Sequence, residues 1–507
     1  MSSLTAAFPS EPGRPTWIWV IVAVALGGVI AVSPWWWLGL AILLIPAAVA
    51  WSAWAPHIGL FLTLVMIFEA VPSDFLPKIA SGGGNFKIYD LCVIYLVVVV
   101  GMRALAKMEP IRERLGHLFW PFVILFGFGA LSLEYGMAFM HNKLALAEGR
   151  NFIGWLIVPL ILLSIDSPKR YRSFFIGVLV IAFVIAVFVS LQSLLNVQIM
   201  TDARVEALNT GDKDVTRSIA GGATYLMVFG LFYFLNRMIE GKSSIFIAIP
   251  FIALMILGLI MSFGRGVWMA TALGLLISAW LHKGTKNALI LASIGAVLVA
   301  GLVAGIASVK PRFGEAIIER ATGVGKEVES GGSVNWRLIE NRIAIESIEK
   351  RPIMGVGMGG EYKRVASIRG TFNVETLYIH NSYLWFPLKM GILAAVVPFL
   401  LIGGFFLSLR DTLKGDDSKP KRAFVAATGG AFCVLLCTSF TQPEWAHLQG
   451  IAAIAILMSF ALLARTFGDP FDAPKNVLAN RGPVGVPADA QPAQSPNAFG
   501  AAFARPR

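Results

Sequence analysis

The sequence carries little charge for its length. Only 14% of its 507 residues are Asp, Glu, Lys or Arg, whereas 56% are apolar. Soluble domains contain about 25% charged residues, so this composition excludes an ordinary soluble protein and predicts a polytopic membrane protein. The 14 tryptophans and 35 phenylalanines fit a large surface at the level of lipid and headgroups.

Cysteine is scarce as well. Cys92, Cys433 and Cys437 lie inside apolar runs and form no CxxC motif. They are interpreted as small packing residues instead of a disulfide or a set of metal ligands. Because the sequence also has no cluster of His and Cys, a structural zinc site is not expected.

A nucleotide-binding loop is not expected either. The motif GVGMGG, residues 355–360, fits the spacing GxGxxG but follows a predicted helix, whereas a dinucleotide fingerprint follows a strand. The glycines are therefore interpreted as a turn behind Pro352, and the sequence predicts no nucleotide cofactor.

Apolar segments recur from end to end, at about the length that a helix needs to cross a bilayer. Counting all of them gives fourteen. The stretch 34–57 is interrupted by Pro and Trp and also fits a re-entrant pair, so 12–14 transmembrane helices are expected. Residues 17–33 lack a small-residue cleavage pattern, so the first span is expected to be retained. The segments lie near 17–33, 35–55, 57–72, 88–105, 118–135, 151–165, 172–194, 218–238, 244–262, 266–281, 287–308, 381–409, 423–440 and 446–467.

Lys and Arg gather in every second connection between these segments. By the positive-inside rule such connections, and with them both termini, are cytoplasmic. This topology accounts for most of the net charge of +12, so no nucleic-acid partner is inferred from it. The opposite connections are expected to face outward; they are 73–87, 136–150, 195–217, 263–265, 309–380 and 441–445.

The longest outward connection is 309–380. Trp336, Ile339, Ile343 and Ile348 recur in it near helical spacing, which predicts an amphipathic helix on the outer membrane face. The predicted organisation is a cytoplasmic N-terminus (1–16), membrane helices 1–11 (17–308), this large loop (309–380), membrane helices 12–14 (381–467) and a Pro/Ala/Gly-rich, disordered cytoplasmic tail (468–507).

Two arginines fall on the predicted outward side. Arg265 lies in the turn SFGRGVW, and Arg217 opens a span within TRSIAGG, where Gly221 and Gly222 permit close backbone approach. A charge at membrane depth costs up to about 3 kcal/mol and usually has a partner. A helix N-terminus beside an arginine suits an anion. The alternative for both arginines is snorkelling to lipid phosphates.

A histidine and an aromatic-cation pair lie on the same side. His380 stands in YIHNSYL, where the long connection re-enters the membrane, and a neutral imidazole there can accept a proton near pH 7. The alternative is a structural histidine bonded at a helix cap with Asn381. Trp336 beside Arg337 suits stacking on a sugar ring, and the alternative is a solvated helix face.

Together these residues favour a site for a lipid-linked diphosphate. The forked donors of arginine bind phosphate oxygens in pairs and stay protonated. Diphosphate is also a good leaving group, whose departure arginine charge stabilises. Transfer to an acceptor hydroxyl also needs a general base, and His380 can serve as that base.

The same segments resemble the O-antigen ligase and O-antigen polymerase superfamily of bacterial envelopes. The resemblance is carried by SFGRGVWMA, NWRLIENRIAIESIEKRPIMGVGMG and IHNSYLWFPLKMGILA, preceded by TRSIAGG, and covers roughly residues 217–395. It implies an all-α, GT-C-like glycosyltransferase that is metal-independent, inverting and free of cofactors. It further implies a saccharide donor on undecaprenyl diphosphate and an active site on the periplasmic face of the inner membrane.

The resemblance also implies residue roles. Arg217 and Arg265 would bind the diphosphate, and His380 would activate the acceptor hydroxyl. The acceptor is a lipid A-core sugar, a growing polysaccharide or a glycoprotein, and the sequence does not choose among them. The accessory candidates are Arg337, Asn381 and Trp336.

Two other functional classes remain open. A polysaccharide flippase or exporter without catalysis would need paired charges at mid-depth and an internal repeat. Charges such as Glu69 and Lys389 are few in the predicted spans and gather toward one face, and no repeat is seen. A structural scaffold of an envelope complex would show no turnover of the donor.

Overall fold

A computed structural model describes residues 52 and 54–472, apart from 72–77, 80–85, 198, 200–204, 208–215, 284, 323–332, 364–376 and 415–417. Among these residues, seven helices are long and apolar enough to cross a membrane, and four further apolar helices are shorter. This confirms the predicted all-α, multi-pass membrane protein. The predicted segments 1–16 and 17–33, and almost all of 35–55, lie outside the described residues.

The helices follow the predicted apolar segments closely. Their bounds are α3 (Pro56–Ile67), α4 (Ile88–Ala106), α5 (Ile111–Leu115), η2 (Gly116–Leu118), α6 (Phe119–Glu134), η3 (Tyr135–Phe139), α7 (Ala145–Gly149), η4 (Arg150–Leu156), α8 (Ile157–Ser164), α9 (Pro168–Leu195), α10 (Ala223–Ile239), α11 (Ile245–Met261), α12 (Arg265–Lys283), α13 (Thr285–Val309), α14 (Pro311–Thr322), α16 (Ser333–Lys350), α17 (Ser382–Met390), η5 (Ile392–Ala395), α18 (Val396–Lys414), α19 (Lys419–Thr438) and α20 (Leu448–Phe467).

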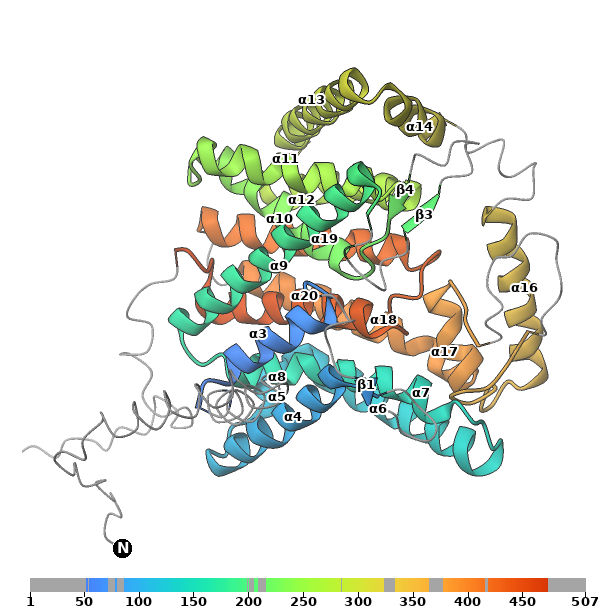
Figure 1. Ribbon diagram of the computed structural model, residues 1–507. Coiled ribbons are helices and arrows are strands. Elements are labelled where there is room, and N and C mark those ends of the chain that lie inside the picture. Colours follow the sequence, from blue (N-terminus) through green and yellow to red (C-terminus); the bar gives the residue numbers. More distant parts are fainter. Residues whose placement is uncertain are drawn as a thin grey trace, which may run out of the picture.

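The described strands form two short antiparallel hairpins. β1 (Lys78–Ile79) pairs with β2 (Phe86–Lys87), and β3 (Val205–Ala207) pairs with β4 (Thr216–Ser218). Both hairpins lie toward the right of Figure 1, as do α7, α16 and α17. We call this the hairpin end of the helix bundle, and we call the opposite end, where α20 finishes, the tail end.

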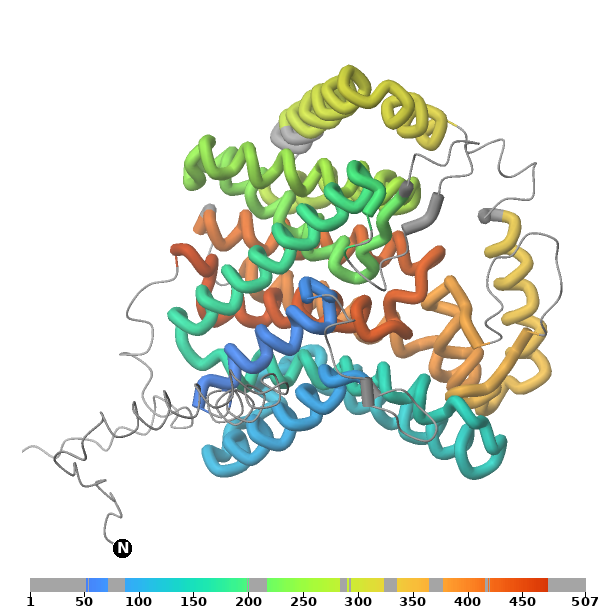
Figure 2. Tube along the Cα trace, viewed as in Figure 1, coloured from blue at the N-terminus to red at the C-terminus, as the bar shows by residue number. Residues whose placement is uncertain are grey.

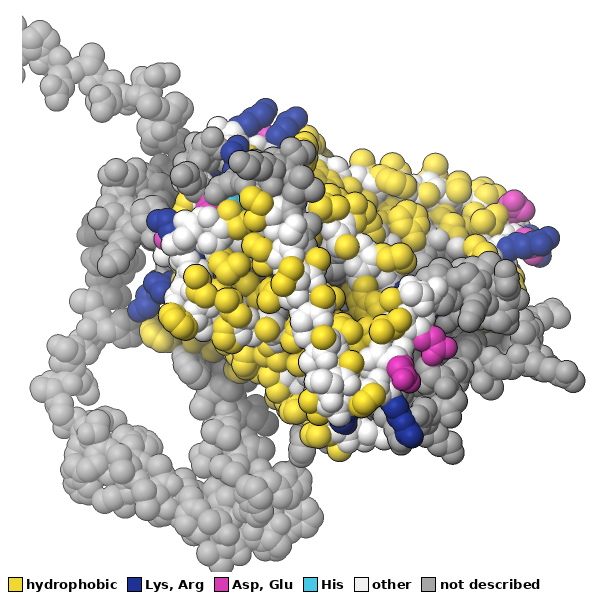
Figure 3. All heavy atoms as spheres, turned by 90° about the horizontal axis from the view of Figure 1, so that it is seen from above, with side chains coloured by type: hydrophobic (Ala, Val, Ile, Leu, Met, Phe, Trp, Pro, Cys, Tyr) yellow, Lys and Arg dark blue, Asp and Glu magenta, His cyan; other side chains and the backbone are white. Residues whose placement is uncertain are grey.

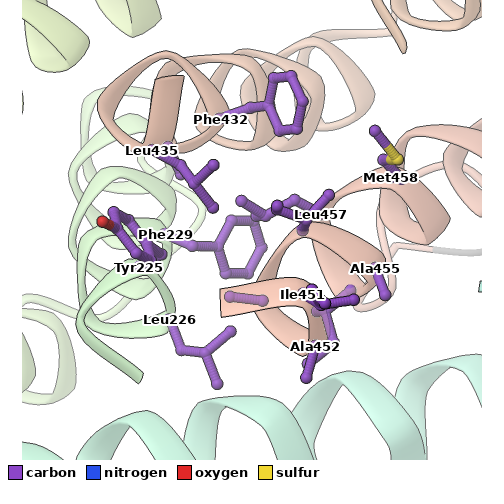
Figure 4. Packing of buried hydrophobic residues seen from close by; sticks show 14 of the residues in the cluster. Tyr225, Leu226, Phe229, Phe432, Leu435, Ile451, Ala452, Ala455, Leu457 and Met458 are labelled. Carbon is purple, nitrogen blue, oxygen red and sulfur yellow. The ribbon is translucent and has the colours of Figure 1, made fainter. Parts of the chain in front are cut away.

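Segments far apart in sequence build the centre of the bundle. α19 packs along α10 and α12, so the late part of the chain lies beside its middle (Figure 2). Figure 4 shows Phe229 of α10 pointing toward Leu457 of α20, with Leu435 of α19 beside them; all three are buried. The alanine-rich helix α20 is almost wholly surrounded by protein, since small side chains let membrane helices approach closely.

The outer surface of the bundle is apolar between its two ends. Figure 3 shows hydrophobic side chains over the middle of one face, with charged side chains gathered toward its borders. Phe246, Met269 and Val297 are among the large apolar residues exposed on α11, α12 and α13. A surface of this kind is stable against lipid tails, where charged groups are costly.

Ion pairs join two Lys/Arg-rich connections at the tail end. Arg103 at the end of α4 and Arg170 at the start of α9 both contact Asp166, at 3.7 and 2.6 Å. The end of α20 is held at this side as well, because Arg237 contacts the buried carboxylate of Asp469 at 2.7 Å. The chain thus stays packed through Asp472, a few residues beyond the predicted start of a disordered tail at residue 468, and 473–507 lie outside the described residues.

The prediction of one helix over 381–409 is wrong. α17 ends at Met390, and α18 begins only at Val396. Between them Gly391 adopts a positive φ of 88°, and a methyl group there would lie 1.8 Å from the carbonyl oxygen of Ile353. The break therefore makes room for the backbone of the turn that begins at Pro352. The carbonyl oxygen of Pro352 accepts a hydrogen bond from the Ile392 amide at 2.7 Å.

Gly391→Ala is expected to destabilise the protein by at least about 2 kcal/mol, because the new methyl group meets both a strained φ and a backbone oxygen. The measurement is the midpoint of thermal inactivation in detergent. Gly403→Ala on α18 is the matched control, since the added methyl group would meet no atom within 4 Å beyond its chain neighbours and the backbone of its own helix. Equal midpoints for the two variants would contradict this account of the break.

Lys389, which lies near a membrane span, pairs with a carboxylate of another helix. Lys389 is fully buried, and its Nζ lies 2.9 Å from Glu148 Oε2 and 2.8 Å from the carbonyl oxygen of Gly360. Glu148 also accepts hydrogen bonds from the Gly359 amide and from Trp385 Nε1. This network ties α7 and α17 to the glycine turn, which confirms that GVGMGG is a structural turn.

Candidate functional site

A cavity of about 460 Å³ lies at the hairpin end. Its volume falls within the range of about 300–1,000 Å³ that is typical of ligand sites. Five of the six connections predicted to face outward contribute to its wall. The contributing residues include Lys87, Arg150, Arg217, Arg337, Tyr378, His380, Thr441, Gln442 and Glu444.

The wall of the cavity carries more positive than negative charge. Four Lys or Arg side chains face two Glu side chains, Glu69 and Glu444. Burial raises the pKa of Glu444 to about 7, against the lowering effect of a hydrogen bond with Tyr225. At neutral pH this carboxyl is therefore partly protonated, which increases the positive balance and favours an anionic ligand.

Three helix N-termini add to this potential. Gly222 is the N-cap of α10 and His447 that of α20, and His380 directly precedes the N-cap of α17. All three residues line the cavity. Each helix N-terminus carries roughly half a positive charge, so their convergence raises the positive potential of the cavity and favours an anion.

Arg217 is positioned by the second hairpin. It lies on β4, where the next residue, Ser218, is anchored by Gln192 of α9 through a hydrogen bond. The glycines that follow allow close packing: a methyl group at Gly222 would lie 2.2 Å from the carbonyl oxygen of Gln449. The loop backbone thus rests directly on the start of α20, and Arg217 is brought to the wall of the cavity.

His380 is held by a buried carboxylate. Its Nδ1 lies 2.7 Å from Glu340 Oε2, which also accepts a hydrogen bond from the His380 amide at 3.0 Å. The other carboxylate oxygen contacts Lys363 Nζ at 2.6 Å. Burial alone raises the pKa of Glu340, but its contacts with His380 and Lys363 outweigh that effect and lower the pKa to about 2.

Tyr378 lies between two imidazoles. Its ring meets His380 edge-on at 4.7 Å and His447 at 5.3 Å, measured between ring centroids. The carbonyl oxygen of Tyr378 accepts a hydrogen bond from the Tyr362 hydroxyl at 2.7 Å. These contacts hold the segment before α17 against the start of α20.

The accessory candidates have different surroundings. Arg337 lines the cavity, but Trp336 is not among the lining residues, and Lys363 Nζ lies over its ring at 5.7 Å. Asn381 caps α17, with Oδ1 accepting hydrogen bonds from the amides of Tyr383 and Leu384. The structure therefore places only Arg337 of these three at the cavity.

Arg265 lies beside the cavity. It is the first residue of α12, is partly buried and is not among the lining residues. Its neighbour Gly266 lies close to the cavity wall, since a methyl group there would be 3.7 Å from Thr441 Oγ1. The structure thus brings Arg217, Arg337 and His380 to one cavity and leaves Arg265 next to it.

Sequence reasoning missed Glu340, Glu444 and His447. A signal existed for Glu340, because it lies four residues after Trp336 and three before Ile343, on the apolar face of the predicted helix. A carboxylate buried on such a face needs a partner. Glu444 and His447 had no local signal. Within the described ranges, no group of three or more His, Cys, Asp or Glu side chains is placed to hold a metal ion.

Part of the chain matches a known protein family. Residues 250–399 match the family described as O-antigen ligase. The matched segment runs from α11 into α18 and contains Arg265, Arg337 and His380, whereas Arg217 precedes it. No curated protein matches the chain. Residues 250–399 are therefore an O-antigen ligase segment, which confirms the resemblance to the O-antigen ligase and O-antigen polymerase superfamily over this part of the chain.

Proposed function

We propose that this protein transfers a saccharide from undecaprenyl diphosphate to an acceptor hydroxyl. The observation that carries the proposal is the convergence of Arg217, Arg337 and His380 on one cavity that three helix N-termini surround. The O-antigen ligase segment supports the same reaction class.

The donor diphosphate binds on the cationic wall. The guanidinium groups of Arg217 and Arg337 donate paired hydrogen bonds to its oxygens. The positive ends of the α10 and α20 helix dipoles add to the attraction for its oxygens. Arg265 lies next to this wall and adds positive charge as the diphosphate departs.

The chemical step needs one base and one stabilised leaving group. His380 removes the proton of the acceptor hydroxyl, and the hydroxyl oxygen attacks the anomeric carbon from the face opposite the diphosphate. The bond between that carbon and the phosphate oxygen breaks, and its electron pair leaves with undecaprenyl diphosphate. Arginine charge stabilises this anion, and the anomeric configuration inverts without a metal ion.

The cavity faces the periplasm in this proposal. The connections rich in Lys and Arg lie at the tail end, which the positive-inside rule assigns to the cytoplasm of a bacterial inner membrane. A donor anchored by its isoprenoid chain then meets the cavity at the outer headgroup level.

A flippase or exporter is the second candidate, and the structure offers it less support. A transport path needs polar groups that are accessible at mid-depth. Lys389, which lies near a membrane span, is fully buried and contacts Glu148 and the carbonyl oxygen of Gly360.

The proposal is tested with purified protein, undecaprenyl-diphosphate-linked oligosaccharide and separate acceptors in detergent. We expect release of undecaprenyl diphosphate together with glycosylation of one acceptor class, unaffected by EDTA. The acceptors are lipid A-core, a growing polysaccharide on its lipid carrier, and a protein. Passage of the lipid-linked saccharide across proteoliposomes without release of undecaprenyl diphosphate would support the flippase instead.

A further inference from the structure

We infer that Glu340 and Lys363 together set the protonation state of His380, so that Nε2 is the atom that accepts the proton of the acceptor hydroxyl. Glu340 is then a positioning residue that acts through His380, and Lys363 balances its charge. The inference rests on the proposed function, because it assigns no separate reaction.

The tautomer follows from the contacts of Glu340. Its Oε2 lies 2.7 Å from His380 Nδ1 and accepts the His380 amide at 3.0 Å. An ionised carboxylate can only accept hydrogen bonds. The proton of the neutral imidazole must therefore reside on Nδ1, and the lone pair belongs to Nε2. Two bonds from one oxygen fix both the backbone and the ring of His380.

The positive charge of Lys363 limits how strongly the Glu340 carboxylate stabilises the protonated His380 ring. Its Nζ contacts Glu340 Oε1 at 2.6 Å, Glu340 is completely buried, and the Lys363 side chain is only 5% exposed. A lone buried carboxylate would hold a proton on both ring nitrogens, and a protonated imidazole is no base. The ammonium group offsets that charge. It is held over the rings of Trp336 and Tyr362, at 5.7 and 5.5 Å.

The helix α16 links the base to the donor site. Arg337 lies three residues before Glu340, so one helix directs Arg337 to the cavity and Glu340 to His380. α16 packs against α17, and His380 directly precedes the N-cap of α17. This explains why a carboxylate occurs on the buried face of an otherwise apolar helix surface.

Other charged or titratable groups surround His380 and are unchanged in the variants below. They are Tyr362 and Tyr378 on the adjoining segment, Arg337 on α16, Arg217 on β4, and Glu444 and His447 before α20. Differences between the variants therefore report Glu340 and Lys363 alone.

The test compares pH–activity profiles of Glu340→Gln and Lys363→Met from about pH 5.5 to about pH 9. Glu340→Gln removes the charge that favours the protonated imidazole, so the acidic limb moves to lower pH. Its kcat also falls, on the order of 10²- to 10⁴-fold, because an amide can also donate a hydrogen bond to Nδ1 and so no longer keeps the imidazole proton on that nitrogen. Lys363→Met leaves the carboxylate unbalanced, so the acidic limb moves to higher pH and activity recovers in alkaline buffer.

Two further variants serve as controls, one for unfolding caused by an unpaired buried charge and one for any substitution on α16. The double variant Glu340→Gln/Lys363→Met removes both buried charges together, and we expect a folded but slow enzyme with an acidic limb between those of the single variants. Arg342→Gln is the matched control on α16, because it disrupts an exposed pair with Glu346 at 3.3 Å and leaves Glu340 and Lys363 in place. Its profile should equal that of the wild type.

The outcomes separate this inference from the proposed function. Full transfer by His380→Ala would overturn the proposed base itself. An inactive His380→Ala, combined with wild-type profiles for both Glu340→Gln and Lys363→Met, would overturn only the positioning role. Should the single variants fail to fold, wild-type kcat in the double variant would overturn it equally.

Discussion

His380→Ala is expected to lower kcat/KM for saccharide transfer by roughly 10²- to 10⁴-fold, the usual contribution of a positioned general base. The imidazole lies at the cavity wall, and in the proposed reaction it alone takes the acceptor proton. Donor binding should persist, because the cationic wall is unchanged. The measurements are release of undecaprenyl diphosphate and binding of the lipid-linked donor.

His117→Gln provides the matched control for that experiment. His117 lies away from the cavity and pairs with Asp411 at 2.7 Å, with 40% of its side chain exposed. Its replacement should leave transfer unchanged. If His380→Ala transferred saccharide at the wild-type rate while folding normally, His380 would be a structural residue at the start of α17.

Arg217→Ala is expected to weaken transfer by about 2–4 kcal/mol, or roughly 30- to 900-fold in kcat/KM, because it removes a charge-assisted, paired contact with the diphosphate. Arg217→Lys should recover only part of this loss, since an ammonium group keeps the charge but not the fork. The measurements are the affinity for the lipid-linked donor and the rate of diphosphate release.

Arg410→Ala is the control for general effects of removing a surface cation. Arg410 lies at the tail end, and its side chain is 57% exposed. We expect unchanged transfer. An Arg217→Ala protein with wild-type donor affinity would show instead that Arg217 only meets lipid phosphates at the membrane surface.

Much of the fold could be predicted because a bilayer restricts what a chain can do. Backbone groups in lipid must be satisfied within each helix, so apolar length alone located most helices; the predicted segment 88–105 became α4 at Ile88–Ala106. Apolar length gave the wrong helix at 381–409. There the helix stops at Gly391 because another part of the backbone occupies the adjacent space.

The candidate site was predicted in part. Sequence patterns placed Arg217, Arg337 and His380 in connections on one side of the membrane, and the structure brings them to one cavity. Trp336 instead packs under Lys363, and Arg265 lies beside the cavity. Residues on adjacent helix positions differ in direction by about 100°, so neighbouring candidates need not share a site.

The sequence by itself determined that this protein is a helical membrane protein, where most of its helices lie, and which connections hold its arginines and histidine. Those properties depend on the hydrophobicity and charge of residues that are close together in the sequence. Tertiary structure alone decided which side chains meet, as Glu340 meets His380 and Lys389 meets Glu148. Such buried partners lie tens to hundreds of residues apart, and only the packing of helices selects them, because a buried charge is stable only where another group reaches it.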